Sequence, residues 1–195
     1  MPFPSDSRVD VEQVSDKNWK LLLEIRYEGK TQSFNAPVSM LTDFASVPRV
    51  FVWLLPRYGH YTMAAIIHDH LWRQVVPSGS LSLRDADGVF RRAMRELGVP
   101  FLQRWVMWAA VRWGAVMKGG LRQGGWWIEL PRVLLITFLV LPIVLPPAVL
   151  VGVGLVLFLL LEVVVWVLLW IGRAVRHLFQ VPSKAVNAPS LSWKL

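Results

Sequence analysis

One apolar segment constrains this chain more than any other feature. From Val133 to Ile171 the sequence runs for 39 residues with a single charged side chain, Glu162. A helix needs about 20 apolar residues to cross the hydrocarbon core of a bilayer, which is about 30 Å thick. As one straight helix the segment would reach about 58 Å, at about 1.5 Å per residue. Two short spans therefore fit its length better than one.

Residues that break helices lie in the middle of this segment. They are Pro142, Pro146, Pro147, Gly152 and Gly154. Proline removes a backbone donor, and glycine loosens the helix. We therefore predict a transmembrane helical hairpin that turns near residues 151–154, with about 17 residues in each arm. The alternatives are a shallow re-entrant wedge, a single span and a buried helical pair in a soluble protein.

Basic residues flank the apolar segment on both sides. Lys118, Arg122 and Arg132 precede it, and Arg173 and Arg176 follow it. Because Lys and Arg stay on the cytoplasmic side of a membrane, we expect both flanks in the cytoplasm. Basic charge beside an apolar anchor favours anionic lipid as the partner.

Glu162 is the one ionisable side chain within the predicted spans. An ionisable residue at this depth is a candidate functional residue. The alternative, which we favour, is a protonated or hairpin-buried carboxyl group that helps two helices associate.

Composition narrows the class of protein. The chain of 195 residues has no cysteine, 54% hydrophobic residues and a formal net charge of +8. It is too apolar to be disordered, and it lacks the thiols of a disulfide scaffold or a cysteine-ligated metal site. Residues 1–132 carry +5 of the charge and the remainder +3, without a Lys/Arg block. We therefore expect no nucleic acid as a partner.

The N-terminal third predicts β-strands. Residues 19–27 are rich in strand formers, and residues 32–38 alternate between apolar and polar side chains. Together they predict a hairpin that turns at residues 28–30. Three valines within residues 9–14 predict an additional edge strand.

Three helices are predicted to follow. Thr62 is placed to cap a helix that continues through Trp72. Ser82 is placed to cap a second helix, for which Gly98 is the C-terminal stop. A third helix covers about residues 100–117.

The third helix combines aromatic and basic side chains. These are Trp105, Trp108, Trp113, Arg104 and Arg112, with Lys118 after it. An apolar helix with basic rims can lie in the membrane interface. Packing in the core is at least as strong an interpretation, because tryptophan at helical spacing is typical of a core.

A group of polar residues is out of place for packing alone. The loop sequence TDFASVP contributes Thr42, Asp43 and Ser46, and the helical sequence AAIIHDHLW contributes His68 and Asp69. The spacing of His68 and Asp69 places them on one helix face with Ala65 and Trp72.

A charged group on a buried helix face needs a partner. Asp43, Arg84 and Asp87 are the available partners, and the last two begin the second helix. His60 and His70 are expected to be surface or rim residues.

These motifs resemble a known family. TDFASVP, AAIIHDHLW and the spaced Arg84 and Asp87 followed by Phe90 are similar to the phage and prophage family catalogued as domain of unknown function 1353. The resemblance covers about residues 33–117. It implies a small α+β domain from a phage or bacterial genome, without a settled activity. The apolar C-terminal region lies outside it and is interpreted as an addition.

Two functions remain open for the polar group. In the first, His68, Asp69 and Asp43 are catalytic, or His68, Asp69 and Asp87 bind a divalent metal that activates water. Such a site would hydrolyse lipid, peptidoglycan or a phosphoester. In the second, the group is structural: Asp43 caps the loop or the first helix, Arg84 pairs with Asp69, and His68 donates to a carbonyl.

We therefore predict an α+β protein with a small β-hairpin or sheet, three helices and a C-terminal transmembrane hairpin. Residues 1–125 form the soluble domain, 126–179 the membrane hairpin, and 180–195 a flexible tail. Thr42, Ser46 and Arg84 support the candidate site, and the cofactor beyond a divalent metal is unknown. The protein is either a membrane-anchored hydrolase or a non-enzymatic virion, ejection or lysis component. It binds the bilayer and other copies of itself or other phage proteins.

Overall fold

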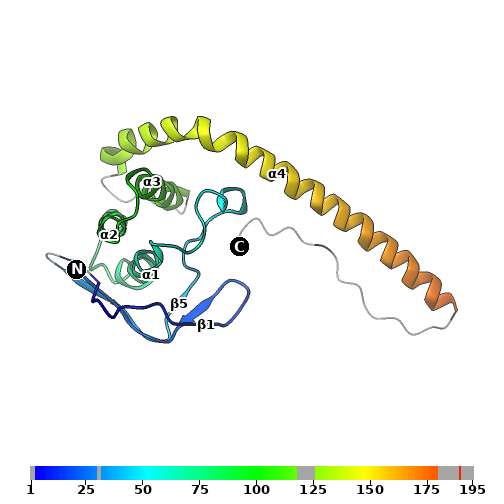
Figure 1. Ribbon diagram of the computed structural model, residues 1–195, viewed down its shortest axis with the longest axis horizontal. Helices are drawn as coiled ribbons and strands as arrows, with labels where there is room; N and C mark the ends of the chain where they lie inside the picture. Colours follow the sequence, from blue (N-terminus) through cyan, green and yellow to red (C-terminus); the bar gives the residue numbers. More distant parts are fainter. Residues whose placement is uncertain (1–2, 30–31, 118–125, 180–188, 190–195) are drawn as a thin grey trace.

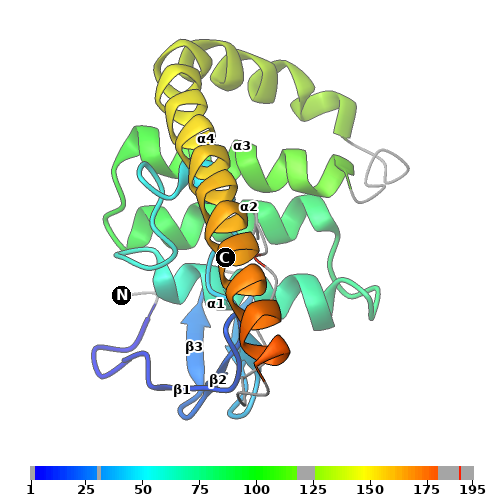
Figure 2. The same cartoon turned by 90° about the vertical axis from the view of Figure 1, so that its right-hand side faces the viewer.

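Small antiparallel sheets come first in this chain and helices follow. The computed structural model describes residues 3–29, 32–117, 126–179 and 189. Figures 1 and 2 show the strands at one side of the molecule, with α1, α2 and α3 stacked above them and α4 over α3. The predicted α+β class is confirmed.

Two sheets are formed by five short strands. Strand β2 (Trp19–Leu21) lies between β1 (Val11–Gln13) and β5 (Leu41–Thr42), and β3 (Ile25–Glu28) pairs with β4 (Ser33–Ala36). The expected edge strand is β1. The expected hairpin is β3–β4.

The sequence predicts one continuous strand over residues 19–27, and this prediction is wrong. The strand is interrupted at residues 22–24, and its two parts, β2 and β3, belong to different sheets. Leu21 and Ile25 are buried while Leu22 and Leu23 are exposed. The Leu22 backbone N–H donates to the Asp10 carbonyl at 2.9 Å. The chain therefore turns after Leu21, and both ends of the segment still reach the core.

Helix α1 (Thr62–His70) lies at the centre of the core. Its residues 64–67 are buried, and the helix contacts β3, β4 and α2 (Leu83–Glu96). The predicted cap at Thr62 is wrong, because the N-cap residue is Tyr61 and no side chain caps it. The Thr62 hydroxyl instead donates to the Gly59 carbonyl at 2.8 Å. A π-helical turn, η2 (Leu71–Val75), continues α1.

The caps predicted for α2 are confirmed. The Ser82 Oγ accepts a hydrogen bond from the Asp85 backbone N–H at 3.1 Å. Gly98 follows the helix with a φ of 76°, a conformation that glycine adopts without a side-chain clash.

Helix α3 (Phe101–Met117) is a packed helix. It contacts α2 and α4, and Trp108 is buried. The Arg91 guanidinium lies 4.2 Å from the centre of the Trp105 ring. Of the two interpretations of this helix, core packing is therefore the one that the structure supports.

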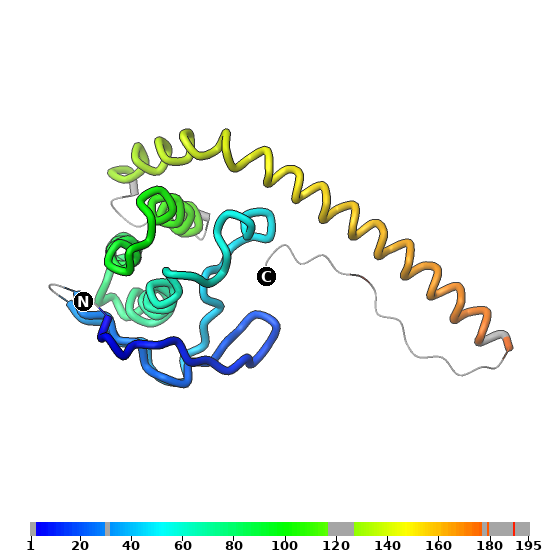
Figure 3. Tube along the Cα trace, in the orientation of Figure 1, coloured from blue at the N-terminus to red at the C-terminus, as the bar shows by residue number. Residues whose placement is uncertain are grey.

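The apolar segment forms one helix, α4 (Trp126–Leu178), and the predicted hairpin is not found. Its 53 residues would reach about 80 Å if straight. The helix bends where its colour passes from yellow-green to yellow in Figure 1 and in the tube of Figure 3. The prolines at 142, 146 and 147 lie in this stretch. Each removes one backbone donor, which kinks an apolar helix without reversing it.

The two parts of α4 have different surroundings. The first part packs against α3 and η1 (Arg49–Phe51), and it buries Glu129, Val133 and Ala148. None of the described residues of α4 after Gly152 is buried. In Figure 1 this second part extends away from the other elements. Among the described residues, α4 is the one helix long and apolar enough to cross a membrane.

Candidate functional site

His68 and Asp87 form the centre of a buried ionic cluster. The His68 Nε2 lies 2.7 Å from the Asp87 Oδ1, and Asp87 is completely buried. The imidazole also packs against the Phe90 ring, with 4.7 Å between the ring centres. Asp87 was expected to pair with a polar side chain on the buried face of α1. The structure confirms this, and the paired side chain is His68.

Arg112, on α3, connects this cluster to α4, because it contacts Asp87 on α2 and Glu129 on α4. Its Nη1 lies 2.9 Å from the Asp87 Oδ2, and its Nε lies 2.9 Å from the Glu129 Oε2. The Glu129 Oε1 in turn lies 3.3 Å from the Arg84 Nε. We call these five side chains, His68, Arg84, Asp87, Arg112 and Glu129, the interhelical network.

The interhelical network joins four helices. Its residues come from α1, α2, α3 and α4, and its two carboxylates are balanced by two guanidinium groups. Arg112 is 3% exposed and Glu129 8% exposed. A buried charge without a partner is strongly destabilising. This network therefore fixes the start of α4 against the domain.

A second cluster surrounds Asp69. The Thr42 hydroxyl donates to the Asp69 Oδ2 at 2.7 Å. The Arg73 Nη2 lies 3.0 Å from the Asp43 Oδ1 and 3.8 Å from the Asp69 Oδ2. The Ser46 hydroxyl donates to Asp43. We call Thr42, Asp43, Ser46, Asp69 and Arg73 the loop cluster.

The loop cluster changes the acidity of Asp69. Burial raises the pKa of the Asp69 carboxyl group, and the nearby Asp43 charge adds to this effect. Arg73 and Thr42 oppose it, and the resulting pKa is about 6. A carboxyl group with a pKa near neutrality can exchange protons at physiological pH, which is a property of general acids and bases.

Local backbone structure positions both clusters. Adjacent residues of a helix point about 100° apart, so His68 faces Asp87 while Asp69 faces the loop. The π-helical turn η2 follows, and it carries Arg73 one turn beyond Asp69. Phe44 adopts a φ of 59°, and its backbone N–H donates to the Thr42 Oγ1 at 3.0 Å. These contacts hold the loop that presents Asp43 and Ser46.

The predicted metal site of His68, Asp69 and Asp87 is not found among the described residues. Within the described ranges, no three His, Asp or Glu side chains are grouped so that they could hold a metal. Asp87 uses its two oxygens for His68 and Arg112. The proposed metal ligands therefore divide between the interhelical network and the loop cluster.

Two further predictions of contacts differ from the structure. Arg84 pairs with Glu129 and not with Asp69. His68 contacts a carboxylate and not a backbone carbonyl. Of the two predictions for Asp43, the structure agrees with a contact within the loop, to Ser46, and not with a cap on α1.

Sequence reasoning did not find the partners Arg73, Arg112 and Glu129. The spacing of Asp69 and Arg73 was a usable signal, because residues four apart meet on a helix. Arg112 belongs to a basic rim only in the interfacial interpretation of the third helix, and its burial rules out that place for it. Its partner Glu129 lies on another helix, so no local pattern pairs the two.

The remaining histidines lie outside both clusters. His60 is exposed, in agreement with its expected place at the surface. His70 is half-buried, and burial lowers the pKa of its imidazole.

Glu162 lies on the second part of α4. It is exposed, and no described residue forms a hydrogen bond or an ion pair with it. The second arm that was expected to bury it is absent, because α4 does not turn back. Its role in helix association and the homo-oligomer stay predictions.

These features define the class of protein: a small α+β domain with two polar clusters on its central helix, fastened to a long apolar helix. Residues 19–111 match the family model described as "Protein of unknown function (DUF1353)". Over these residues the chain is similar to that family, and α4 lies outside the matched segment. Neither the curated proteins nor the solved structures searched gave a match.

Proposed function

We propose that this protein is a membrane-attached member of its family, and that the interhelical network fastens its domain to the membrane helix. One observation carries the proposal. After Gly152, α4 presents apolar side chains such as Leu157, Leu160 and Leu168, each more than half exposed. Leaving such a side chain in water costs about 1.5–3 kcal/mol relative to burial. A bilayer would remove this cost.

The length of the exposed part supports the same proposal. Residues 153–171 contain one charged residue, Glu162. As a helix they reach about 28 Å, close to the roughly 30 Å thickness of a hydrocarbon core. The first part of α4 packs on one side against α3 and η1, but it also exposes Phe138, Ile143 and Leu150. We place the span in residues 153–171, because no residue of this range is buried against the domain.

The proposed setting is the inner membrane of a bacterium, with a role as a phage or prophage component in the virion, in ejection or in lysis. The resemblance of the TDFASVP and AAIIHDHLW motifs to a phage family supports it. Neighbouring genes for tail or lysis proteins are the expected observation. Consistent placement among unrelated metabolic genes would contradict the phage role.

Truncation tests the membrane attachment. We expect the full chain to stay with membranes during alkaline carbonate extraction, because an inserted helix resists it. A chain that ends after Gly152 keeps Glu129, Val133 and the other packed residues and should be released. A chain that ends after Arg176 is the matched control and should be retained. Release of the full chain would contradict the proposal.

A second function, hydrolysis at the loop cluster, is favoured by one observation. The pKa of Asp69 lies near 6, and this carboxyl group is close to Asp43 and to the Ser46 hydroxyl that binds Asp43. In this proposal Asp69 exchanges the proton, Asp43 orients the group that attacks, and Thr42 and Ser46 support them. Lipid, peptidoglycan and phosphoesters remain the substrate classes.

Matched substitutions separate the two functions. If the loop cluster hydrolyses one of these substrates, Asp69→Asn should reduce the rate by about 100-fold to 10,000-fold, which is the typical contribution of general acid–base catalysis. The exposed Asp16→Asn should leave it unchanged. No hydrolysis by the wild-type chain across the three substrate classes would contradict this second function.

A further inference from the structure

An apolar loop lies against α4 at the residue where the helix leaves the domain. The element η1 contacts α4. A Cβ atom at Gly152 would lie 3.8 Å from the Val50 Cγ1. Because no described residue of α4 after Gly152 is buried, Val50 marks the domain end of the exposed apolar helix.

The loop has the composition of a membrane interface. Residues 49–58 read RVFVWLLPRY. Trp53 is 44% exposed and Tyr58 is 70% exposed. The Trp53 Nε1 donates to the Val50 carbonyl at 2.9 Å, so the polar atom of the indole is satisfied within the loop. Exposed tryptophan and tyrosine are enriched where headgroups meet acyl chains.

Two arginines at the ends of the loop have unsatisfied nitrogens. The Arg49 Nε and the Arg57 Nε and Nη2 are buried, and no described residue accepts a hydrogen bond from them. Both side chains are only half-buried, so their positive charge is still felt at the surface of the loop. A guanidinium group at such a place attracts anionic lipid headgroups beside the apolar residues of the loop.

We propose that the loop of residues 49–58 docks into the headgroup region of an anionic bilayer, beside the point where α4 enters it. This inference rests on the proposed function, because it uses residues 153–171 as the span. If the span begins next to Gly152, Val50 and its loop lie at the same depth as the bilayer surface. Trp53 and Tyr58 then anchor the domain, and Arg49 and Arg57 bind lipid phosphates.

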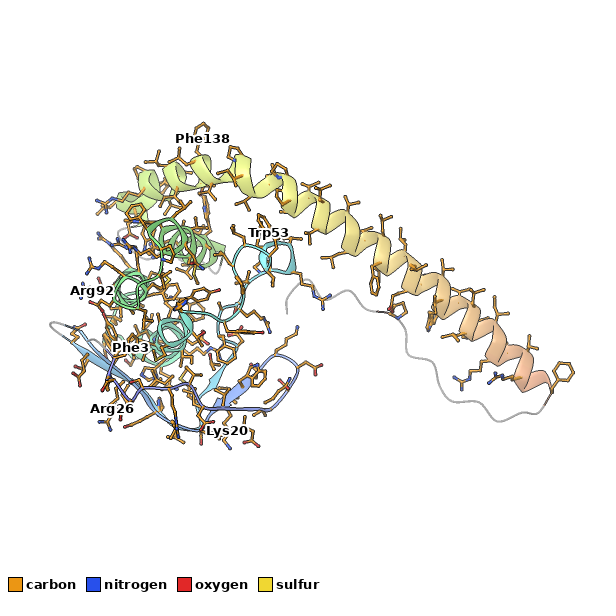
Figure 4. The ribbon with its side chains drawn as sticks, in the orientation of Figure 1. Phe3, Lys20, Arg26, Trp53, Arg92 and Phe138 are labelled. Atoms are coloured by element: carbon orange, nitrogen blue, oxygen red, sulfur yellow. The ribbon has the colours of Figure 1, made fainter. Side chains whose placement is uncertain are left out.

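The structure also provides a site that should stay in water. Figure 4 labels Trp53 beside α4 and Arg92 on the opposite side of the domain. Arg92 is exposed, and it belongs to neither cluster. The chain has no cysteine. A single introduced cysteine therefore reports on one position at a time in the full-length protein.

The test uses the full chain in nanodiscs of equal amounts of phosphatidylcholine and phosphatidylglycerol. An environment-sensitive fluorophore is attached to the cysteine of each of three single variants, Tyr58→Cys, Arg92→Cys and Leu160→Cys. We expect a nitroxide on the lipid headgroup to quench the label at 58 and not the label at 92. A nitroxide deep in the acyl chain should quench the label at 160. Adding Arg49→Gln and Arg57→Gln to Tyr58→Cys should reduce the headgroup quenching.

The outcomes separate this inference from the proposed function. If the label at 58 behaves like the label at 92 while the label at 160 is quenched, the loop does not dock although α4 spans the bilayer. If the label at 160 is not quenched either, the span and the docking both fail. Equal quenching at 58 in discs of phosphatidylcholine alone would overturn the role of the two arginines and of anionic lipid.

Discussion

At the scale of single residues, Arg112 links the domain directly to α4. It forms ion pairs with Asp87 on α2 and with Glu129 on α4, at 2.9 Å in each case. Residue 112 directly follows the segment that matches the family model. The His68–Asp87 pair lies within that segment. The interhelical network therefore extends a contact within the matched segment to a helix that lies outside it.

Arg112→Met is expected to destabilise the protein strongly. The substitution leaves Asp87 and Glu129 buried without their shared cation, and removing one partner of a buried ion pair costs about 3–5 kcal/mol. Urea unfolding of the full chain in detergent micelles, followed by tryptophan fluorescence, measures the change. Arg92→Met is the matched control and should change the free energy of unfolding by less than about 0.5 kcal/mol. Equal effects of the two variants would show that the network contributes nothing.

Asp69→Asn is expected to change stability in a pH-dependent way. The pKa of Asp69 is raised from 3.8 to about 6 by burial and by Asp43. The folded chain therefore binds this proton more tightly than the unfolded chain, and the free energy of unfolding falls as the pH rises from about 4 to about 6. The asparagine variant has no carboxyl group at this position, so its free energy of unfolding does not fall for this reason. Its stability relative to the wild type should increase by about 1–3 kcal/mol between these pH values.

Unfolding of both chains at several pH values checks this sign. The exposed Asp16→Asn is the control, and its difference from the wild type should stay constant with pH. A constant difference for Asp69→Asn as well would contradict the raised pKa of Asp69.

At the scale of the elements, local signals predicted the strands and helices that depend on neighbouring residues. The β3–β4 hairpin and the cap at Ser82 are of this kind. The break at residues 22–24 could not be predicted, because it depends on the contact of Leu22 with Asp10 and on burial of Leu21 and Ile25 together. Long-range packing decided that break against local strand propensity.

The candidate site shows the same limit. His68, Asp69, Asp43 and Asp87 were identified as polar residues that need partners. Their division into two clusters depends on how α1 is oriented between α2 and the loop, which the sequence pattern leaves open. For α4, the prolines and glycines in the middle of the apolar segment predict a turn near residues 151–154, whereas a helix with i→i−4 bonds on both sides of such residues only bends.

A distance measurement distinguishes the bent helix from the hairpin. Spin labels at Leu135→Cys and Leu168→Cys lie 33 residues apart on α4, so a straight helix would place them about 50 Å apart and a bend slightly less. The arms of a hairpin would bring such positions within roughly 10 Å, the usual spacing of packed helices. We expect the long distance by double electron–electron resonance of the full chain in nanodiscs. A short distance would restore the hairpin.

At the scale of the whole molecule, one helix performs two tasks in succession. Its first part completes the domain through Glu129, Val133 and the hydrogen bond from the Trp113 Nε1 to the Thr137 Oγ1 at 3.0 Å. Its second part is exposed and apolar. The domain is therefore joined to the apolar helix by packed contacts and not by a free linker, so it should keep a fixed orientation toward a bilayer that the helix crosses.

A single span also changes the expected topology. With two spans both flanks lie on the same side, but one crossing by residues 153–171 places the domain and the C-terminus on opposite sides. Basic residues occur on both flanks, so charge alone does not favour either side strongly. The absence of native cysteine allows a direct test with Ser5→Cys in the domain and Ser192→Cys in the tail. In sealed vesicles of one orientation, a thiol reagent that does not cross membranes should label only one of the two variants until detergent is added. Labelling of both before detergent would indicate a hairpin or a helix that does not cross, and the distance between labels at 135 and 168 would then tell those two apart.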